Sequence, residues 1–277
     1  MSFFDQRNEF RAVAVATALF VAPSWAEQVP PEALDSLPVA EIVLLGEVHD
    51  NPIHHLNQAR ALEALRPAAV VFEMLTQEQA EFVNGTPARG AALGAALGWE
   101  DSGWPDFAMY QPVFEATGSA RIYGMAVSRE ESQSVFGRSA AEVFGSGAGR
   151  FGLEGPLPDD ELAAREAYQM AAHCDALPEH MLPGMVAAQR LRDAVFSRTA
   201  LQALEETGGP VAVITGSGHV RKDWGMPAAL GVAAPDVSVL AVGQVEMPAK
   251  DVPPFDLWLV TEPAEREDPC LAFRDRS

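Results

Sequence analysis

The chain has few lysines and no long apolar segment after its N-terminal region. Its only lysines are Lys222 and Lys250, and 19 Lys+Arg stand against 39 Asp+Glu, which gives a formal net charge of −20. An acidic surface without an Arg/Lys-rich stripe repels phosphate backbones, so we expect no nucleic-acid partner. Because no later run is long enough to cross a bilayer, we also expect no stable transmembrane segment.

Cysteine is equally scarce, with Cys174 and Cys270 as its only two positions. Their spacing fits neither a zinc site nor a redox motif, both of which use closely spaced cysteines. An oxidising compartment would allow a disulfide between them, and two free thiols are the alternative. The sequence leaves both states open, and it places no lipidation cysteine near the N-terminus.

The first 26 residues have the pattern of a secretory signal. Arg7 and Arg11 precede an apolar run over residues 12–21, and Ser24-Trp25-Ala26 fits a small-x-small cleavage site. The apolar run is too short to span a membrane. We therefore predict a cleaved signal over residues 1–26 and an exported, periplasmic protein; an ordinary buried helix is the alternative.

The remaining residues, 27–277, are predicted to form a single α/β domain. Six apolar runs without alternation are typical of strands buried on both faces, as in a mostly parallel sheet flanked by helices. These runs cover residues 41–46, 68–74, 120–127, 210–216, 237–243 and 256–261. No strand-like run occurs from about residue 129 to 205, where helical periodicity predicts an insert lobe between the third and fourth strands.

Polar residues follow four of the predicted strands. Glu47 and His49 come after the first strand, Glu73 ends the second, Arg129 follows the third, and His219 follows the fourth. Ligands of open parallel sheets bind beyond the carboxyl ends of the strands, which lie on one edge. These five side chains therefore form a candidate catalytic or binding cluster.

The cluster is compatible with two kinds of chemistry. Glu73 lies in an apolar run, and burying its carboxylate unpaired would cost several kcal/mol, so it needs a partner such as Arg129, a histidine or a metal. A histidine could activate water, or a divalent ion could bind Glu47, His49, Glu73 and His219. No His-Glu-x-x-His helix or cysteine set supports zinc. Of the neighbouring His54 and His55, we expect one inward and one exposed, both in supporting roles.

Three motifs carry a family resemblance. The blocks "GEVHDNPIHH", "VVFEM" and "TGSGHVR" resemble the ChaN-like haem-binding uptake family of the Tiki/TraB/erythromycin-esterase superfamily. Residues 104–116 and 173–197 also fit the family, the latter with Gln189, Arg192 and Asp193. The resemblance extends from about residue 40 to 245.

The resemblance implies an exported haem-binding protein in iron or haem acquisition. It further implies a homodimer that holds haem between subunits, and an outer-membrane haem receptor system as a partner. Many family members are lipoproteins, whereas this chain lacks the lipidation cysteine.

Haem is thus the expected cofactor, and a tyrosine is a suitable ligand of ferric iron. Tyr110, Tyr168 and the nearby His173 are the candidate haem contacts, whereas Tyr123 lies in a strand and is expected in the core. Esterase-like relatives use the same histidine blocks for hydrolysis. A metal-dependent hydrolase is therefore the alternative, and whether the protein is an enzyme stays open.

Overall fold

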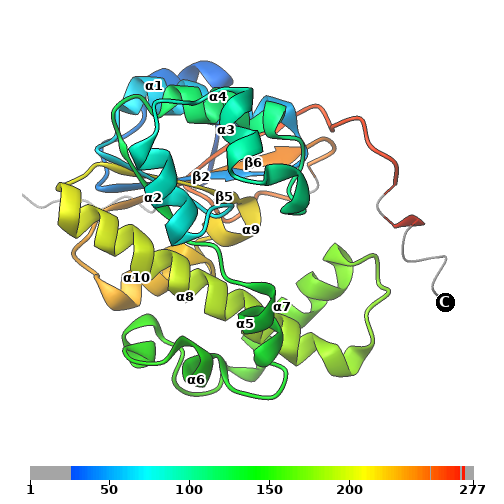
Figure 1. The fold of residues 1–277 in the computed structure, drawn as a ribbon. Helices are drawn as coiled ribbons and strands as arrows, with labels where there is room; N and C mark the ends of the chain where they lie inside the picture. Colours follow the sequence, from blue (N-terminus) through cyan, green and yellow to red (C-terminus); the bar gives the residue numbers. More distant parts are fainter. Residues whose placement is uncertain (1–25, 250, 269, 272–277) are drawn as a thin grey trace, which may run out of the picture.

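The computed structural model describes residues 26–249, 251–268 and 270–271. The predicted signal therefore lies outside the described residues, except for Ala26. Within the described part, a seven-stranded parallel sheet is covered by helices on both faces (Figure 1). Its strands are β1 (Glu27–Gln28), β2 (Ile42–Glu47), β3 (Ala69–Phe72), β4 (Arg121–Gly124), β5 (Val211–Gly216), β6 (Val239–Glu246) and β7 (Leu257–Thr261).

The strands lie in the order β1-β7-β6-β2-β5-β3-β4, and every pairing is parallel. All six predicted strands are present. They were recognisable because strands buried on both faces form apolar runs that polar residues do not interrupt. The two-residue strand β1 was not predicted. It pairs with β7 at the sheet edge, and Glu27 and Gln28 give no apolar signal.

One face of the sheet is covered by the N-terminal helices. These are the 3-10 helix η1 (Pro31–Ser36), then α1 (Pro52–Leu65), α2 (Gln77–Gly85), α3 (Ala91–Ala96), the 3-10 helix η2 (Trp99–Asp101) and α4 (Phe107–Ala116). Phe72 of β3 stacks on Phe114 of α4, with ring centroids 4.7 Å apart. Asn51 caps α1 by accepting a hydrogen bond from the Ile53 amide, and Pro52 occupies the first turn, where its missing N–H is not needed.

The opposite face is covered by the 26-residue helix α8 (Leu182–Thr207) and by α10 (Met226–Ala233), as Figure 1 shows. Phe196 of α8 lies in the apolar core on this side of the sheet, together with Met226 and Leu230 of α10. A short helix, α9 (Ser217–Val220), connects β5 to this layer.

A helical lobe follows β4 and packs against the part of α8 that reaches beyond the sheet (Figure 1). It comprises α5 (Arg129–Ser134), α6 (Ala140–Phe144), the 3-10 helix η3 (Ala148–Phe151), α7 (Asp159–Ala172) and the 3-10 helix η4 (Glu179–Met181). The lobe has a core of its own, in which the rings of Phe144 and Phe151 lie 5.4 Å apart. The fold class is confirmed, including the helical insert between the third and fourth predicted strands.

Cys174 and Cys270 form a disulfide with a Cα–Cα distance of 5.5 Å. Of the two states that the sequence left open, the structure therefore has the bridged one. The bond links the end of the lobe helix α7 to the segment that follows β7. Among the described residues, the helices all fall short of the length and apolar character that a membrane span requires.

Candidate functional site

The strand-end cluster lies where β2, β5 and β3 end side by side. Glu47, the last residue of β2, is in register with Gly216, the last residue of β5, and Glu73 directly follows β3. The chain passes from β2 to β3 and returns later to insert β5 between them. Changes of direction of this kind open a crevice at the carboxyl edge of a parallel sheet.

Glu47 is almost fully buried and holds three side chains together. The Tyr110 hydroxyl donates to its Oε1 at 2.6 Å, His49 Nδ1 lies 2.7 Å from the same oxygen, and His55 Nε2 lies 3.4 Å from Oε2. Burial alone would raise the pKa of Glu47, but the two histidines hold it well below its usual value. Glu47 is therefore an ionised structural centre of the site.

Glu73 faces the cluster from the end of β3 and is 7% exposed. Its Oε2 accepts hydrogen bonds from Thr215 Oγ1 at 2.7 Å and from the Gly216 amide at 2.9 Å. His219 Nε2 lies 3.6 Å from Oε1, and His49 Nε2 lies 4.0 Å from Oε2. Burial opposes ionisation, but the two histidine charges and these hydrogen bonds keep the pKa of Glu73 below its usual value. The predicted need for a partner is thus met by two histidines.

Gly216 leaves room for the close approach of His49. A Cβ atom built at Gly216 would lie 2.9 Å from His49 Nε2, so a larger residue would require the His49 ring to shift. Although burial lowers the pKa of His49, the hydrogen bond to Glu47 and the charges of Glu73 and Asp50 raise it to about 9. His49 is therefore a cation at neutral pH, and it packs against Trp104 with ring centroids 4.9 Å apart.

His219 is paired with a carboxylate that the predicted cluster did not contain. Its Nδ1 lies 2.6 Å from Asp193 Oδ1 and 3.0 Å from Gln189 Nε2, both on α8. Burial works against the charge on His219, but Glu73 and Asp193 raise its pKa, whereas burial raises that of Asp193. The sequence does contain a signal for Asp193. Its carboxylate falls between the apolar residues Leu191 and Ala194 of a predicted helix, where a buried charge needs a partner.

The cluster forms the floor of a pocket of about 750 Å³ between the sheet edge and the helical lobe. The wall combines aromatic and apolar side chains with a few polar ones. Besides the cluster, the lining side chains include Trp104, Val127, Tyr168, Gln169, His173, Met185, Gln189, Arg192 and Phe196. Pockets of this size and mixture are typical of cofactor sites.

The prediction that Arg129 belongs to the cluster is wrong. Strand β4 ends at Gly124, and the chain then leaves the sheet, with Ser128 capping the lobe helix α5. Arg129 is consequently exposed and lies outside the pocket lining. The guanidinium group in the pocket belongs to Arg192 of α8.

The three candidate haem contacts have different surroundings. Tyr168 and His173, both from the α7 region, line the pocket, and Tyr168 is 39% exposed. Tyr110 instead lies fully buried behind Glu47, because α4 packs its ring against Trp99 and His55. Burial raises the pKa of Tyr110 above its usual value, and the phenol lies outside the pocket lining. Tyr110 is thus separated from any ligand in the pocket.

His54 and His55 are both fully buried, which corrects the expectation that one is exposed. The Val48 amide donates to His54 Nδ1 at 2.8 Å, and His54 Nε2 lies 2.8 Å from Thr261 Oγ1. Burial lowers the pKa of His54 to about 4. Both rings point inward because the first turn of α1 packs directly on the strand ends.

The metal alternative gains no support from the geometry. In the part of the chain that the structure describes, no group of three or more His, Cys, Asp or Glu side chains is arranged to hold a metal ion. His49 and His219 are instead engaged with carboxylates that favour their protonated forms, and metals bind neutral imidazole.

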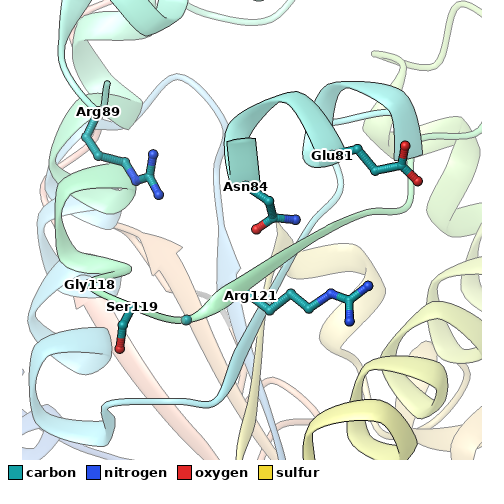
Figure 2. A pocket seen from close by; sticks show the side chains of 7 residues that line it. Glu81, Asn84, Arg89, Gly118, Ser119 and Arg121 are labelled. Atoms are coloured by element: carbon teal, nitrogen blue, oxygen red, sulfur yellow. The ribbon is translucent and has the colours of Figure 1, made fainter. Parts of the chain in front are cut away.

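A second hollow lies at the amino end of β4 (Figure 2), away from the cluster. Its polar side chains have partners within the protein. Asn84 exchanges hydrogen bonds with the backbone of Ile122, Arg89 donates to the carbonyls of Val83, Thr86 and Ala88, and Arg121 pairs with Glu206. Asn84, Arg89 and Arg121 are therefore already engaged within the protein.

Comparison with known proteins supports the family. Residues 33–230 match the family described as "Haem-binding uptake, Tiki superfamily, ChaN". Among solved structures, ChaN of Campylobacter jejuni with cofacially bound haem aligns with a TM-score of 0.61 and 20% identity, over 82% of this chain and 88% of that one. The type III effector HopBA1 aligns with a TM-score of 0.43 and 10% identity, over 84% and 91%.

No curated protein matches the chain. The family match nevertheless covers more than two thirds of the sequence. It includes residues 46–49 and 216–219, which contain His49 and His219, and the other residues of the strand-end cluster. The chain therefore belongs to the ChaN haem-binding uptake family of the Tiki superfamily.

Proposed function

We propose that this protein binds haem in the pocket between the sheet edge and the helical lobe. The observation that carries the proposal is the composition of the pocket wall. Apolar side chains suit the macrocycle, Arg192 suits a propionate, and Tyr168 and His173 offer oxygen and nitrogen donors for iron. The family match and the solved haem complex of Campylobacter jejuni ChaN support the same ligand.

Within this pocket, Tyr168 is the preferred iron ligand. A phenolate oxygen is a hard donor that suits ferric iron. His173 Nδ1 lies 2.8 Å from the Gln169 carbonyl, which orients the ring, so Nε2 would be the nitrogen that binds iron. Carboxylates raise the pKa of His49 and His219, which disfavours the neutral imidazole that iron requires. The exposed phenol is therefore preferred over His49 and His219, and His173 is the alternative ligand. Bound haem would supply a redox-active iron, and the protein's contribution is to bind and orient it.

Titration of the purified protein with hemin tests the proposal. We expect saturable binding with a shifted Soret band and a phenolate-to-iron charge-transfer band. Tyr168→Phe should remove the charge-transfer band and weaken binding about tenfold, equivalent to about 1.4 kcal/mol. Tyr123→Phe is the matched control, because the Tyr123 hydroxyl donates to Glu206 outside the pocket. Absence of saturable binding would refute the function, whereas binding without the charge-transfer band that is weakened by His173→Ala would move the ligand to His173.

We further propose that the protein is exported to the periplasm and acts in iron or haem acquisition. The pattern of residues 1–26 supports export, as does the Cys174–Cys270 disulfide, since disulfides persist mainly in oxidising compartments. A homodimer with haem between subunits and an outer-membrane haem receptor as partner belong to the same proposal.

Hydrolysis is a second candidate function, favoured by the Asp193–His219 pair beside Glu73. The lowered pKa of Glu73 favours the carboxylate that can accept a proton from water, and the raised pKa of His219 favours the protonated ring that can donate one to a leaving group. Asp193 would orient the imidazolium. This reading requires no metal ion.

An ester and peptide substrate panel tests the hydrolase reading. If one substrate is turned over, Glu73→Gln and His219→Ala should each lower kcat/KM by about 100-fold or more. Glu63→Gln, on the exposed side of α1, is the control. Turnover that survives both substitutions would reject the cluster as the catalytic site.

A further inference from the structure

Helix α7 of the lobe meets the segment after β5 through a stack of aromatic rings and guanidinium groups. Trp224 is contacted by two guanidinium groups, with Arg221 Cζ 4.0 Å and Arg165 Cζ 5.5 Å from its ring centroid. The Tyr168 and Trp224 rings are 5.9 Å apart at 65°. Arg221 Cζ also lies 5.0 Å from the centroid of the Tyr168 ring. Arg221 therefore contacts both rings at once.

Both guanidinium groups are fixed by carboxylates of their own. Arg221 makes a bidentate pair with Asp223, with Nε–Oδ1 and Nη2–Oδ2 distances of 3.0 and 2.6 Å. Arg165, only 8% exposed, donates from Nε to Glu161 at 2.9 Å. Bidentate pairing fixes the plane of a guanidinium group as well as its position. The stack is therefore a rigid support rather than a chance surface contact.

The stack determines where the phenol of Tyr168 lies. A Cβ atom built at Gly218 would be 3.6 Å from the Tyr168 hydroxyl oxygen, so that oxygen lies over the turn between β5 and His219. Tyr168 is 39% exposed. Its ring contacts Arg221 and Trp224.

We propose that Arg221 is a positioning residue for Tyr168, holding its ring at the pocket wall and stabilising the negative oxygen of its phenolate. The proposal rests on the haem-binding function. To hold ferric iron, the Tyr168 oxygen would give up its phenol proton to solvent, and the side chain would then carry a negative charge. A guanidinium over the ring face attracts that charge, both by direct Coulomb interaction and through the π system.

Other charged groups also surround Tyr168. Arg165, Glu161 and His173 belong to the α7 region, Arg192 projects from α8, and Asp223 and His219 flank Arg221. Arg221 is the group that lies over the face of the Tyr168 ring, with its Cζ 5.0 Å from the ring centroid. Removing the charge of Arg221 should therefore destabilise the phenolate form of Tyr168 more than removing a charge that lies farther away.

Arg221→Gln tests the proposal in the haem-loaded protein. We expect hemin affinity to fall about tenfold, and the pH at which the charge-transfer band is lost on acidification to rise by about one unit. The sign follows because, without the cation, the phenolate is protonated at a higher pH. Arg221→Lys keeps the charge and should retain the original midpoint. Arg198→Gln is the matched control, because Arg198 covers Phe144 in the lobe at 4.4 Å instead of Tyr168.

The outcomes separate this proposal from the function on which it rests. Weaker affinity in Arg221→Gln with an unchanged midpoint would overturn the proposal, since packing alone would then explain the effect. If Arg221→Gln does not fold, Arg221→Lys provides the test. A midpoint in Arg221→Lys clearly above that of the unmodified protein would then overturn the proposal. If Tyr168→Phe keeps the charge-transfer band, the ligand assignment fails first, whatever Arg221 does.

Discussion

Replacing Glu47 with alanine is expected to lower the free energy of unfolding by about 3–5 kcal/mol, because it breaks a buried ion pair from one side. Glu47 is 2% exposed and interacts with Tyr110, His49 and His55. Without its carboxylate, the fully buried hydroxyl of Tyr110 loses its acceptor at 2.6 Å, and His49 loses the partner that keeps it charged. Urea denaturation followed by circular dichroism measures the change.

Two variants separate the loss of charge from the loss of a hydrogen-bond acceptor. Glu47→Gln keeps an oxygen for the Tyr110 hydroxyl, so its cost should be clearly smaller than that of alanine. Glu63→Ala, on the exposed side of α1, should change stability by about 0.5 kcal/mol or less. A Glu47→Ala cost no larger than that of Glu63→Ala would contradict the assignment of Glu47 as the centre of the site.

The strands were predictable from sequence because all but β1 contain a run of buried apolar residues. In β2 and β5 every residue is buried, so the apolar run and the strand almost coincide. The polar residue that ends each run then marks the carboxyl edge of the sheet. This is why Glu47, Glu73 and His219 could be grouped from the sequence alone.

The errors arise where the chain leaves the sheet. Arg129 follows the third predicted strand as His219 follows the fourth, but β4 lies at one edge of the sheet and the chain continues from it into the lobe. No local pattern distinguishes these two exits. Asp193 was missed from the cluster for the converse reason, since a residue of α8 reaches the sheet edge only through the packing of the whole lobe.

The inward direction of both His54 and His55 also required tertiary information. Adjacent helical residues point about 100° apart, which suggests that one of the two should face solvent. Here α1 begins directly over the strand ends, so Thr261 of β7 receives one ring and Glu47 of β2 the other. A helix start surrounded by strand ends buries a wider arc than a helix lying on a flat face.

The Cys174–Cys270 disulfide is expected to contribute about 2–4 kcal/mol to the free energy of unfolding. The two cysteines are 96 positions apart, and cross-links that close long loops restrict the unfolded chain most. The segment after β7 is also held at the carboxyl ends of the strands. There the Ala264 amide donates to Glu246, and Arg266 pairs with Asp50. In Figure 1 this orange-to-red segment leaves the sheet on the side where the lobe lies.

The same bond should influence the haem pocket. Cys174 directly follows His173, which lines the pocket, and the chain turns there with positive φ angles at Cys174 and Asp175. The disulfide thus connects the pocket wall on the lobe to a segment anchored on the sheet. Opening it should allow α7, with Tyr168, to move away from the strand-end cluster.

Comparison of the unmodified protein with Cys174→Ser/Cys270→Ser, each with and without dithiothreitol, checks both effects. The reductant should lower the urea midpoint and the hemin affinity of the unmodified protein to the values of the double variant. The double variant itself should not respond, which controls for effects of the reductant on the rest of the chain. If thiol titration shows full reduction while stability and affinity stay unchanged, the bond does not connect the lobe to the sheet in the manner described, because a released lobe would lose both the chain-entropy contribution and the fixed position of Tyr168.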